Sequence, residues 1–369
     1  MSGTSLDGID GVLVDFASDR ADTGIRVLAH AKRAFTPALR AALAALNSSS
    51  DDEIHRAALA ANALARDSAA LVESLRAAAS VDRDRVVAIG THGQTVRHRP
   101  GEFDGTGYTV QLNAPALLAE LTSIDVVADF RSRDVAAGGQ GAPLVPAFHR
   151  AVFARPDATV AVLNLGGVAN LTVLGATGST TGFDCGPANT LLDLWSNRSS
   201  GHPYDAEGAT AARGRVDPRL LDALQAEPFF ALAPPKSTGL DLFNAGWLDT
   251  RLDASDARAR LRPEDIQATL AQLTAQIATD ACRRYAPDAV ELIVCGGGAA
   301  NADLMRRLGR SLAPMPVVAS DMRGLPTDQV EAAAFAWLAR AFVSRMPGNL
   351  ASATGASGPR VLGALYPAR

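Results

Sequence analysis

Apolar residues are most clearly grouped in one part of the chain, at residues 161–193. Val162, Leu163 and Leu165 form an apolar run that ends at Gly166-Gly167, and a second apolar run follows over residues 168–174. Two such runs joined by a glycine turn are typical of a β-hairpin. Because glycine has no side chain, backbone N–H groups in the turn can approach a ligand such as phosphate closely. We therefore predict a ligand-binding hairpin here.

An acidic turn and a helix are predicted directly after this hairpin. Asp184 stands between Phe183 and Cys185-Gly186-Pro187, and apolar residues at helical spacing follow Asn189, the expected N-cap. A carboxylate on such a turn is positioned to meet a substrate. The alternative is that Asp184 only caps the turn, and the residues alone give the two interpretations equal weight.

The remaining periodicities predict alternating strands and helices. Strands are expected at 9–16, 26–35, 85–89, 108–112, 124–130 and 290–294, and helices at 37–46, 52–79, 114–121, 143–153, 266–285 and 331–342. This alternation, with residues 108–130 as a βαβ unit, is typical of an α/β fold. Residues 197–265 are predicted to be an insertion of loops and short helices. The glycine-rich stretch 138–141 is a natural segment between two domains.

Length and composition restrict the classes of function. The chain has 369 residues, of which 47% are hydrophobic and 20% charged, and this suits two domains with sizeable cores. A net charge of −4 gives no electrostatic case for nucleic acid as the main partner. No apolar run approaches the length of a membrane helix, about 18 residues. Three cysteines match no zinc or disulfide pattern, so we expect a cytoplasmic enzyme with no membrane or nucleic-acid partner.

Three glycine turns predict a site for a nucleotide. They lie at Gly3–Gly8, at Gly166-Gly167 and at Gly296–Gly298, each beside a strand-like segment. A Walker A loop is absent. For the third turn the alternative is a dinucleotide site, because residues 296–301 nearly match GxGxxG and Asp321 follows a later strand. A Rossmann fold usually opens with this fingerprint, whereas here it comes late.

Four other polar residues are candidates only in combination. His92 and Gln94 lie in the polar loop 90–95 after a predicted strand, where α/β folds place ligands. Their alternative role is to satisfy the backbone of the loop. Arg131 could belong to a surface ion-pair cluster with Arg133 and Asp134. Glu331 begins an apolar helix, where it either favours the helix dipole or faces a cleft.

Eight motifs, in order along nearly the whole chain, resemble those of the anhydro-N-acetylmuramic acid kinase family. They are GTSLDGID (3–10), GTHGQT (90–95), DFRSRD (129–134), GGQGAPLVPAFH (138–149), NLGGVANLT (164–172), GFDCGPAN (182–189), PPKSTG (234–239) and CGGGAAN (295–301). The resemblance implies an α/β fold of the actin-like, hexokinase-like ATPase class, with two related domains around a nucleotide cleft. It also implies a reaction in peptidoglycan recycling: ATP, water and 1,6-anhydro-N-acetylmuramic acid give N-acetylmuramic acid 6-phosphate and ADP.

The same resemblance implies roles for individual residues. Asp184 matches the general base, which would take a proton from the water that attacks the anomeric carbon. Sugar or water would be held by His92, Gln94, Thr95, Arg131 and Glu331. The first phosphate loop would be Gly3, Thr4, Ser5, Leu6, Asp7, Gly8, Ile9 and Asp10, the second Gly166 and Gly167, and the adenosine-side turn Gly296, Gly297 and Gly298. The expected cofactors are ATP and Mg²⁺, the partner is the small-molecule sugar, and a homodimer is a candidate assembly.

The expected domains are two. The first is residues 1–130 plus 346–369, with the first phosphate loop and the sugar contacts. The second is residues 131–345, with the second loop, the base and the adenosine turn.

The chain departs from the family pattern at several places. Ala188 replaces the second glycine of GPGN, Leu240 stands where arginine is common, and Asn113-Ala114 replaces a Gly-Asn pair. A strand before the first loop is also expected from the family pattern, and we expect it to be missing here. Ala188 would matter if that position needs a positive φ.

Two alternatives to this function are consistent with the sequence. One is a plain sugar kinase, in which Asp184 would deprotonate a sugar hydroxyl instead of water. The other is a nucleotide-gated binding protein on the same fold, with no turnover. Release of ADP with candidate sugars would separate turnover from binding alone.

Overall fold

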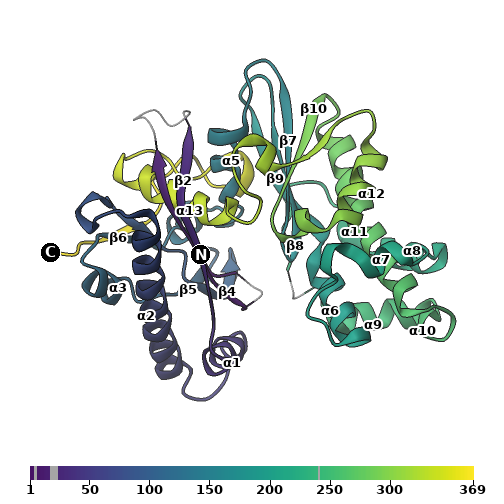
Figure 1. The fold of residues 1–369 in the computed structure, drawn as a ribbon, viewed down its shortest axis with the longest axis horizontal. Helices are drawn as coiled ribbons and strands as arrows, with labels where there is room; N and C mark the ends of the chain where they lie inside the picture. Colours follow the sequence, from purple (N-terminus) through teal and green to yellow (C-terminus); the bar gives the residue numbers. More distant parts are fainter. Residues whose placement is uncertain (4–5, 17–23, 240–241) are drawn as a thin grey trace. The chain divides into compact units, whose positions relative to one another are not determined.

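A computed structural model describes residues 1–3, 6–16, 24–239 and 242–369. It divides the chain into two compact units (Figure 1): unit 1 is Met1–Val152 with Gln329–Arg369, and unit 2 is Phe153–Asp328. These limits differ from the predicted domain boundaries at 130/131 and 345/346. Helices α4 (Ser132–Ala136), α5 (Val145–Phe153) and α13 (Val330–Val343) lie wholly or mainly in unit 1. The reason is clearest for α13, because it packs on strands of unit 1.

Unit 2 is built on a five-stranded sheet with the order β11-β10-β7-β8-β9. Its strands are β7 (Thr159–Leu165), β8 (Val168–Leu174), β9 (Thr180–Pro187), β10 (Ala289–Cys295) and β11 (Val317–Ala319). β7, β8 and β9 form an antiparallel meander, whereas β10 runs parallel to β7 and β11 runs parallel to β10. The hairpin predicted around Gly166-Gly167 is therefore confirmed, as is the α/β class.

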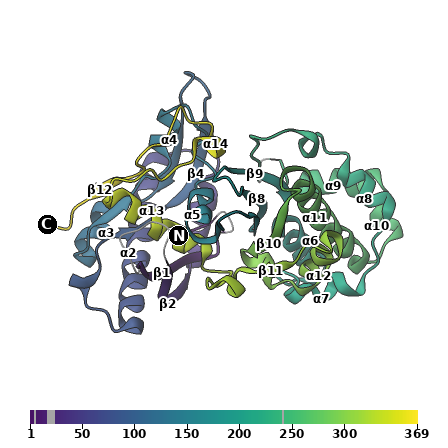
Figure 2. The same ribbon diagram turned by 90° about the horizontal axis from the view of Figure 1, so that it is seen from above.

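The sheet of unit 2 is covered by the long helix α11 (Pro263–Tyr285). Its apolar residues Ile266, Leu270 and Leu273 recur at helical spacing and are almost fully buried. Burying each such side chain contributes roughly 2 kcal/mol. The helix α6 (Asn189–Ser200) packs beside α11 (Figure 2), and α12 (Ala302–Leu312) packs on it as well. The predicted helix at 266–285 is confirmed.

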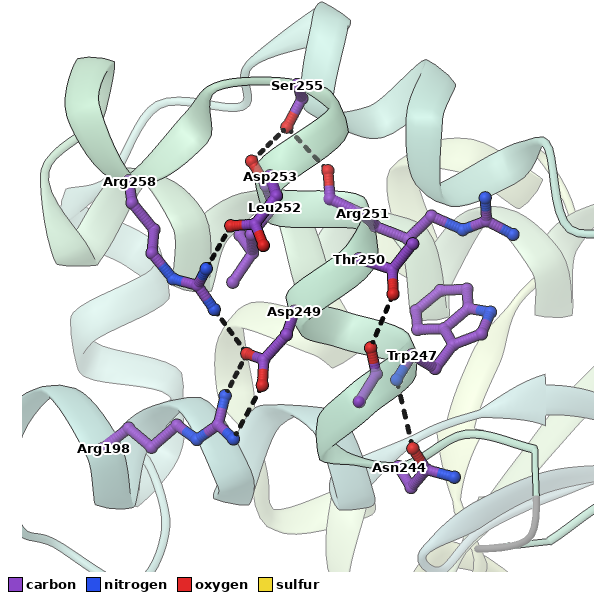
Figure 3. A network of polar contacts seen from close by, with 11 residues as sticks. Arg198, Asn244, Trp247, Asp249, Thr250, Arg251, Leu252, Asp253, Ser255 and Arg258 are labelled. Atoms are coloured by element: carbon purple, nitrogen blue, oxygen red, sulfur yellow. Dashed lines mark hydrogen bonds and ion pairs between the residues drawn. The ribbon is translucent and has the colours of Figure 1, made fainter.

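Residues 197–265 form short helices and loops, as predicted. The helices are α7 (Ala209–Arg213), α8 (Pro218–Gln225), α9 (Ala245–Ala254) and α10 (Ala257–Arg260). The Asn244 side chain caps α9 by accepting the Trp247 N–H at 3.1 Å. Asp249 of α9 accepts two hydrogen bonds from Arg198 of α6, at 2.6 and 3.3 Å, and also contacts Arg258 (Figure 3). These contacts connect α6, α9 and α10.

Two further side chains of α9 bind Glu227 and so hold the beginning of the segment 228–239, which leads toward Asp184. The carboxylate of Glu227 accepts hydrogen bonds from Trp247 Nε1 at 2.8 Å and from Arg251 at 3.1 Å. Glu227 also caps the short 3₁₀ helix Pro228–Ala231. The chain from Pro228 to Gly239 is thus fixed at its beginning.

The described residues of unit 1 form three small sheets. They are β1 (Gly8–Phe16) with β2 (Ile25–Ala34), β4 (Gln94–Pro100) with β5 (Gly107–Leu112), and β12 (Ala364–Tyr366) with β6 (Val126–Ala128) and β3 (Ile89–Gly90). Helices α1 (Pro37–Ala45), α2 (Glu53–Ala79), α3 (Pro115–Thr122) and α14 (Ala351–Thr354) complete the unit. Helix α2 packs closely on β1 at Gly11, where an added Cβ would lie 2.8 Å from Leu71 Cδ2.

Two predictions for unit 1 were wrong. The strand expected at 85–89 is reduced to Ile89–Gly90, preceded by the 3₁₀ helix Arg83–Arg85. Residues 108–130 do not form a βαβ unit, because β5 pairs with β4 and not with β6. The strand β4 was missed since its residues QTVRHRP are mostly polar and show no apolar alternation.

The helix α13 is apolar nearly all round and is buried in unit 1. Glu331 at its beginning is exposed, whereas Ala332, Ala333, Ala334 and Phe335 are buried, as predicted. It contacts β1, β3 and β6. Neither α13 nor any other helix in the described ranges combines the length and apolar character needed to span a bilayer.

Candidate functional site

Asp184 lies within strand β9 and not on the turn that the sequence predicted. In the meander it stands opposite Asn170 of β8, whose Nδ2 donates to Asp184 Oδ1 at 2.8 Å. The second carboxylate oxygen, Oδ2, accepts the backbone N–H of Thr238 at 2.9 Å. Each oxygen therefore has one donor, and together the two donors fix the plane of the carboxylate.

The environment of Asp184 favours a bound proton. Burial raises the pKa of its carboxyl group, although the hydrogen bonds from Asn170 and Thr238 and the nearby Lys236 ammonium oppose that rise. Loss of solvent is the larger effect. A carboxylate with a raised pKa is a better proton acceptor than an ordinary aspartate, as a general base requires.

The segment Lys236–Thr238 runs beside β9 and completes the surroundings of Asp184. The Asp184 N–H donates to the Lys236 carbonyl at 3.1 Å. The Lys236 ammonium is bound in turn by the carbonyls of Phe229 and Phe230, at 3.1 and 3.3 Å. Lys236 therefore holds its own loop in place, and this loop presents the Thr238 N–H to the carboxylate.

Asn170 and Thr238 were missed as candidates in the sequence. Asn170 belongs to the NLGGVANLT motif, and extending the predicted hairpin to a third strand would have placed it near Asp184. Thr238 belongs to the PPKSTG motif, but 54 positions separate it from Asp184, and no sequence pattern indicated that the two residues are neighbours.

The turn Gly166-Gly167 presents backbone donors that the protein itself does not use. Within the described ranges, the N–H groups of Gly166 and Gly167 have no hydrogen-bond acceptor. Their carbonyls instead accept N–H groups at the start of α6: Asn189 donates to Gly166 at 3.0 Å and Ala188 donates to Gly167 at 2.9 Å. The turn is thus held from one side while its donors remain available to an anion.

Asn189 connects this turn to the turn Gly296–Gly298. It does not cap α6 as predicted; Ala188 holds the cap position, and the Asn189 Nδ2 donates to the Leu165 carbonyl at 3.0 Å. An added Cβ on Gly298 would lie 2.6 Å from the Leu165 Cβ and 3.1 Å from Asn189 Oδ1. The second and third glycine turns therefore meet around Leu165 and Asn189.

Gly296 itself has a conformation that only glycine adopts readily. Its φ is 80°, and an added Cβ would lie 2.4 Å from Asn164 Oδ1. The two following N–H groups, of Gly297 and Gly298, have no acceptor among the described residues. Asp321, the acidic residue of the dinucleotide alternative, instead accepts the Thr327 N–H at 3.2 Å.

Ala188 does not occupy a position that requires glycine. Its φ is −119°, so the substitution in the GPAN motif carries no left-handed strain. Leu240, the second departure, lies outside the described residues.

Unit 1 contains the remaining predicted site residues. Thr4 and Ser5 of the first phosphate loop lie outside the described ranges. Gly8, Ile9 and Asp10 form the beginning of β1, and Gly8 fits closely there because an added Cβ would lie 2.3 Å from the Arg33 carbonyl oxygen. Asp10 Oδ1 lies 3.6 Å from the Lys32 ammonium and 3.8 Å from His30.

His92 and Arg131 are joined directly, and Glu331 acts electrostatically on Arg131. Arg131 Nε donates to His92 Nε2 at 2.9 Å, and its NH1 group donates to the Gly141 carbonyl at 2.7 Å. Burial, assisted by Arg131, lowers the pKa of His92 well below its ordinary value, so the ring is neutral. Burial also lowers the pKa of Arg131 to about 10, against the opposing charges of Glu331 and Asp134, and the guanidinium stays charged.

Arg131, Arg133 and Asp134 do not form a surface ion-pair cluster. Asp134 is fully buried and accepts hydrogen bonds from the Gly141 N–H at 2.8 Å, from Asn349 at 2.6 Å and from Thr354 at 2.7 Å. It therefore fixes the same loop whose Gly141 carbonyl receives Arg131.

Gln94 and Thr95 point to opposite faces of the hairpin β4–β5, as neighbours in a strand do. Gln94 is buried, and its Oε1 has no hydrogen-bond donor in the described part of the chain. Thr95 lies opposite Gln111 and accepts a hydrogen bond from it at 3.2 Å. The sugar-binding roles of both residues stay predictions.

Comparisons with known proteins show to which family the chain belongs. The family model described as anhydro-N-acetylmuramic acid kinase matches residues 1–368. The chain belongs to the anhydro-N-acetylmuramic acid kinase family. It is 58% identical over 373 residues to the anhydro-N-acetylmuramic acid kinase of Variovorax paradoxus, covering 100% of this chain and 98% of that protein. It is also 58% identical over 369 residues to the protein of that name from Bordetella petrii, covering 100% and 95%.

Membership of the anhydro-N-acetylmuramic acid kinase family confirms the resemblance found in the sequence. Among solved structures, the activator of the 2-hydroxyisocaproyl-CoA dehydratase from Clostridium difficile with bound ADPNP aligns with a TM-score of 0.43 at 10% identity, covering 87% of this chain and 88% of that one.

The raised pKa of Asp184 makes the stability of this kinase depend on pH. An unfolded aspartate has a pKa of about 3.9. The folded chain binds this proton more tightly than the unfolded chain does. The contribution of Asp184 to stability is therefore fully present below the unfolded pKa and is lost as pH rises through the folded pKa. The Asp184→Asn variant does not titrate here. Its free energy of unfolding relative to wild type should therefore increase between about pH 4 and pH 8, as measured by denaturant titration.

The exposed Asp288 provides the control for this measurement. The difference between wild type and Asp288→Asn should be nearly constant over the same pH range. A pH-independent difference for Asp184→Asn, or one that shrinks as pH rises, would contradict the raised pKa.

Proposed function

We propose that the chain is an ATP-dependent kinase that opens the 1,6-anhydro ring of 1,6-anhydro-N-acetylmuramic acid with water and phosphorylates O6. The product is N-acetylmuramic acid 6-phosphate, which fits a role in peptidoglycan recycling. One observation supports this most strongly. The Asp184 carboxylate accepts two hydrogen bonds, from Asn170 and from the Thr238 N–H. Asn170 lies on the same sheet as Asp184 and only three positions after Gly167, whose N–H has no acceptor among the described residues. A base and phosphate-binding donors are thus close together in unit 2.

The ionised Asp184 carboxylate takes one proton from a water molecule. The water oxygen forms a bond to the anomeric carbon, and the bond between that carbon and O6 breaks. O6 then attacks the γ-phosphorus of ATP, and the bond from that phosphorus to the β–γ bridging oxygen breaks as ADP leaves. The proton on Asp184 returns to solvent. This order gives the carboxylate the only proton-accepting role in ring opening.

The glycine turns of unit 2 supply the donors for the phosphates. Free N–H groups on Gly166, Gly167, Gly297 and Gly298 require no reorganisation to meet negative charge, and the strands and α6 hold them in place. We assign Gly166-Gly167 to the phosphates and Gly296–Gly298 to the adenosine side of the nucleotide. In the proposal, Gly3–Asp10 of unit 1 form the other phosphate loop.

Mg²⁺ is proposed to bind together with ATP. When bound, it neutralises phosphate charge during phosphoryl transfer. The described residues contain no group of three or more histidine, cysteine or acidic side chains that could hold a metal ion. This donor set still suits Mg²⁺, which usually binds nucleotide phosphates and only one or two carboxylates. Asp7 and Asp10, the acidic residues of the first loop, are the carboxylates that we assign to it.

The sugar is assigned to the polar residues of unit 1. Arg131 remains charged at neutral pH and can bind a carboxylate or a hydroxyl, while the neutral His92 beside it adds no second charge. Gln94, Thr95 and Glu331 complete the proposed set. We also propose a cytoplasmic location, which is supported by the requirement for ATP and by three free cysteines.

Replacing the base tests its role directly. Asp184→Asn preserves the shape of the side chain but removes the proton acceptor, so turnover should fall on the order of 10²-fold or more. Turnover is measured as ADP release with 1,6-anhydro-N-acetylmuramic acid as the substrate, and ATP binding is measured by calorimetric titration. Nucleotide affinity should stay close to that of wild type. Turnover near the wild-type value would place the base elsewhere, with Glu331 as the next candidate.

The fate of the water oxygen distinguishes the proposed reaction from its alternatives. In ¹⁸O-water, sampled before the anomeric hydroxyl exchanges with solvent, the label should appear on the anomeric oxygen of the phosphorylated sugar. A plain sugar kinase would leave the sugar unlabelled. Label in released inorganic phosphate, or ring opening without ATP, would favour an ATPase or a hydrolase. A nucleotide-gated binding protein would release no ADP at all.

A further inference from the structure

One face of the hairpin β4–β5 carries four polar side chains in a row. They come from the paired positions Thr95↔Gln111 and His98↔Thr109. Side chains at paired positions lie on the same face of a hairpin, so all four belong to one surface. Only Thr95 has a place in the proposed function. All four residues are half-buried.

Hydrogen bonds connect the four side chains into a continuous chain. Gln111 Nε2 donates to Thr109 Oγ1 at 2.7 Å and to Thr95 Oγ1 at 3.2 Å. Thr109 Oγ1 lies 3.0 Å from His98 Nδ1. The two ends of this chain are therefore His98 and Thr95, and Gln111 lies next to Thr95.

The protonation of His98 determines the direction of these bonds. Burial, assisted by the charges of Arg131 and Arg99, lowers the pKa of His98 to about 4, so the ring is neutral in the working range. The backbone of Gln140 favours the single ring proton. Because Nδ1 faces Thr109, that proton belongs on Nε2, and Nδ1 accepts from the Thr109 hydroxyl. The oxygen of Thr109 is then an acceptor, which requires the NH₂ group of Gln111 to face it.

This direction leaves two groups available at the Thr95 end. No residue in the described ranges donates to Gln111 Oε1, and the side chain is only half-buried. Thr95 Oγ1 already accepts from Gln111, so its own proton can be donated to a ligand. An acceptor and a donor thus stand side by side. An acetamido group presents the complementary pair, an N–H donor and a C=O acceptor.

We propose that Gln111 is a specificity-determining residue: its Oε1 accepts the acetamido N–H of the bound sugar while Thr95 donates to the acetamido carbonyl. The proposal rests on the proposed function, because it assumes that the hairpin faces the sugar. His98 and Thr109 are positioning residues that hold the Gln111 amide with its oxygen toward the ligand. These two residues would therefore recognise an uncharged ligand group that has a hydrogen-bond donor next to an acceptor.

The test is calorimetric binding of three sugars to wild type and to Gln111→Ala. These are 1,6-anhydro-N-acetylmuramic acid, 1,6-anhydro-N-acetylglucosamine, which lacks the lactyl group, and 1,6-anhydroglucose, which lacks the acetamido group as well. Loss of one neutral hydrogen bond should raise Kd about 10-fold for both acetamido sugars. The Kd for 1,6-anhydroglucose should not change. A purely structural role would not produce this selectivity.

Two further variants complete the test. Thr109→Val keeps the shape of the side chain but releases the Gln111 amide, and should weaken the same two sugars to a smaller extent. Val110→Ala lies on the opposite face of the same strand and should leave all three affinities unchanged. Equal weakening of all three sugars by Gln111→Ala, or no weakening of any, would overturn the proposal. If wild type binds none of the sugars, the proposed function itself fails, which is a different result.

Discussion

The candidate site depends on how the carboxylate of Asp184 is held. A carboxylate that loses solvent is costly unless hydrogen bonds replace the lost water. Here one bond comes from a neighbouring strand, through Asn170, and the other from a distant loop, through the Thr238 N–H. Because the replacement is incomplete, burial still raises the pKa. The same interactions therefore position the group and make it a stronger base.

Much of unit 2 serves to keep these two donors in place. The register of β8 and β9 sets Asn170 opposite Asp184, and a one-residue shift would turn one of the two side chains to the other face. On the loop side, Glu227 and the carbonyls that bind Lys236 fix the segment that carries Thr238. The start of α6 holds the turn Gly166-Gly167 by its carbonyls and leaves the N–H groups available. Rigid elements thus carry both the proposed base and the proposed phosphate donors.

The sequence predicted the elements whose periodicity is strong, and it failed where polar residues form a strand. The apolar runs around Gly166-Gly167 and the helical spacing of α11 and α13 correspond to real elements because burial determines both. β4 was missed because one of its faces carries Thr95 and His98, which bond to polar partners on β5 instead of entering the core. Its polar pattern resembles that of a loop.

The site was predicted only as far as single motifs allow. Asp184 and the glycine turns stand in recognisable sequence contexts, and the structure brings the second and third turns together around Asn189. Asp184 was placed on a turn because Gly186-Pro187 follows it, yet pairing with β8 extends the strand through Pro187. Cross-strand partners such as Asn170, and backbone donors such as the Thr238 N–H, depend on register and tertiary contact. Residue types in one sequence do not specify these.

The most direct test of the account is the pH dependence of kcat/KM in wild type and in Asn170→Ala. This parameter reports the ionisation of the free enzyme. In wild type the acid limb should lie above the ordinary aspartate value of about 3.9. In Asn170→Ala, which removes a bond to the ionised carboxylate, the limb should move to higher pH while activity at high pH is largely kept. An acid limb at the same pH in both enzymes would contradict the claim that Asp184, held by Asn170, is the base.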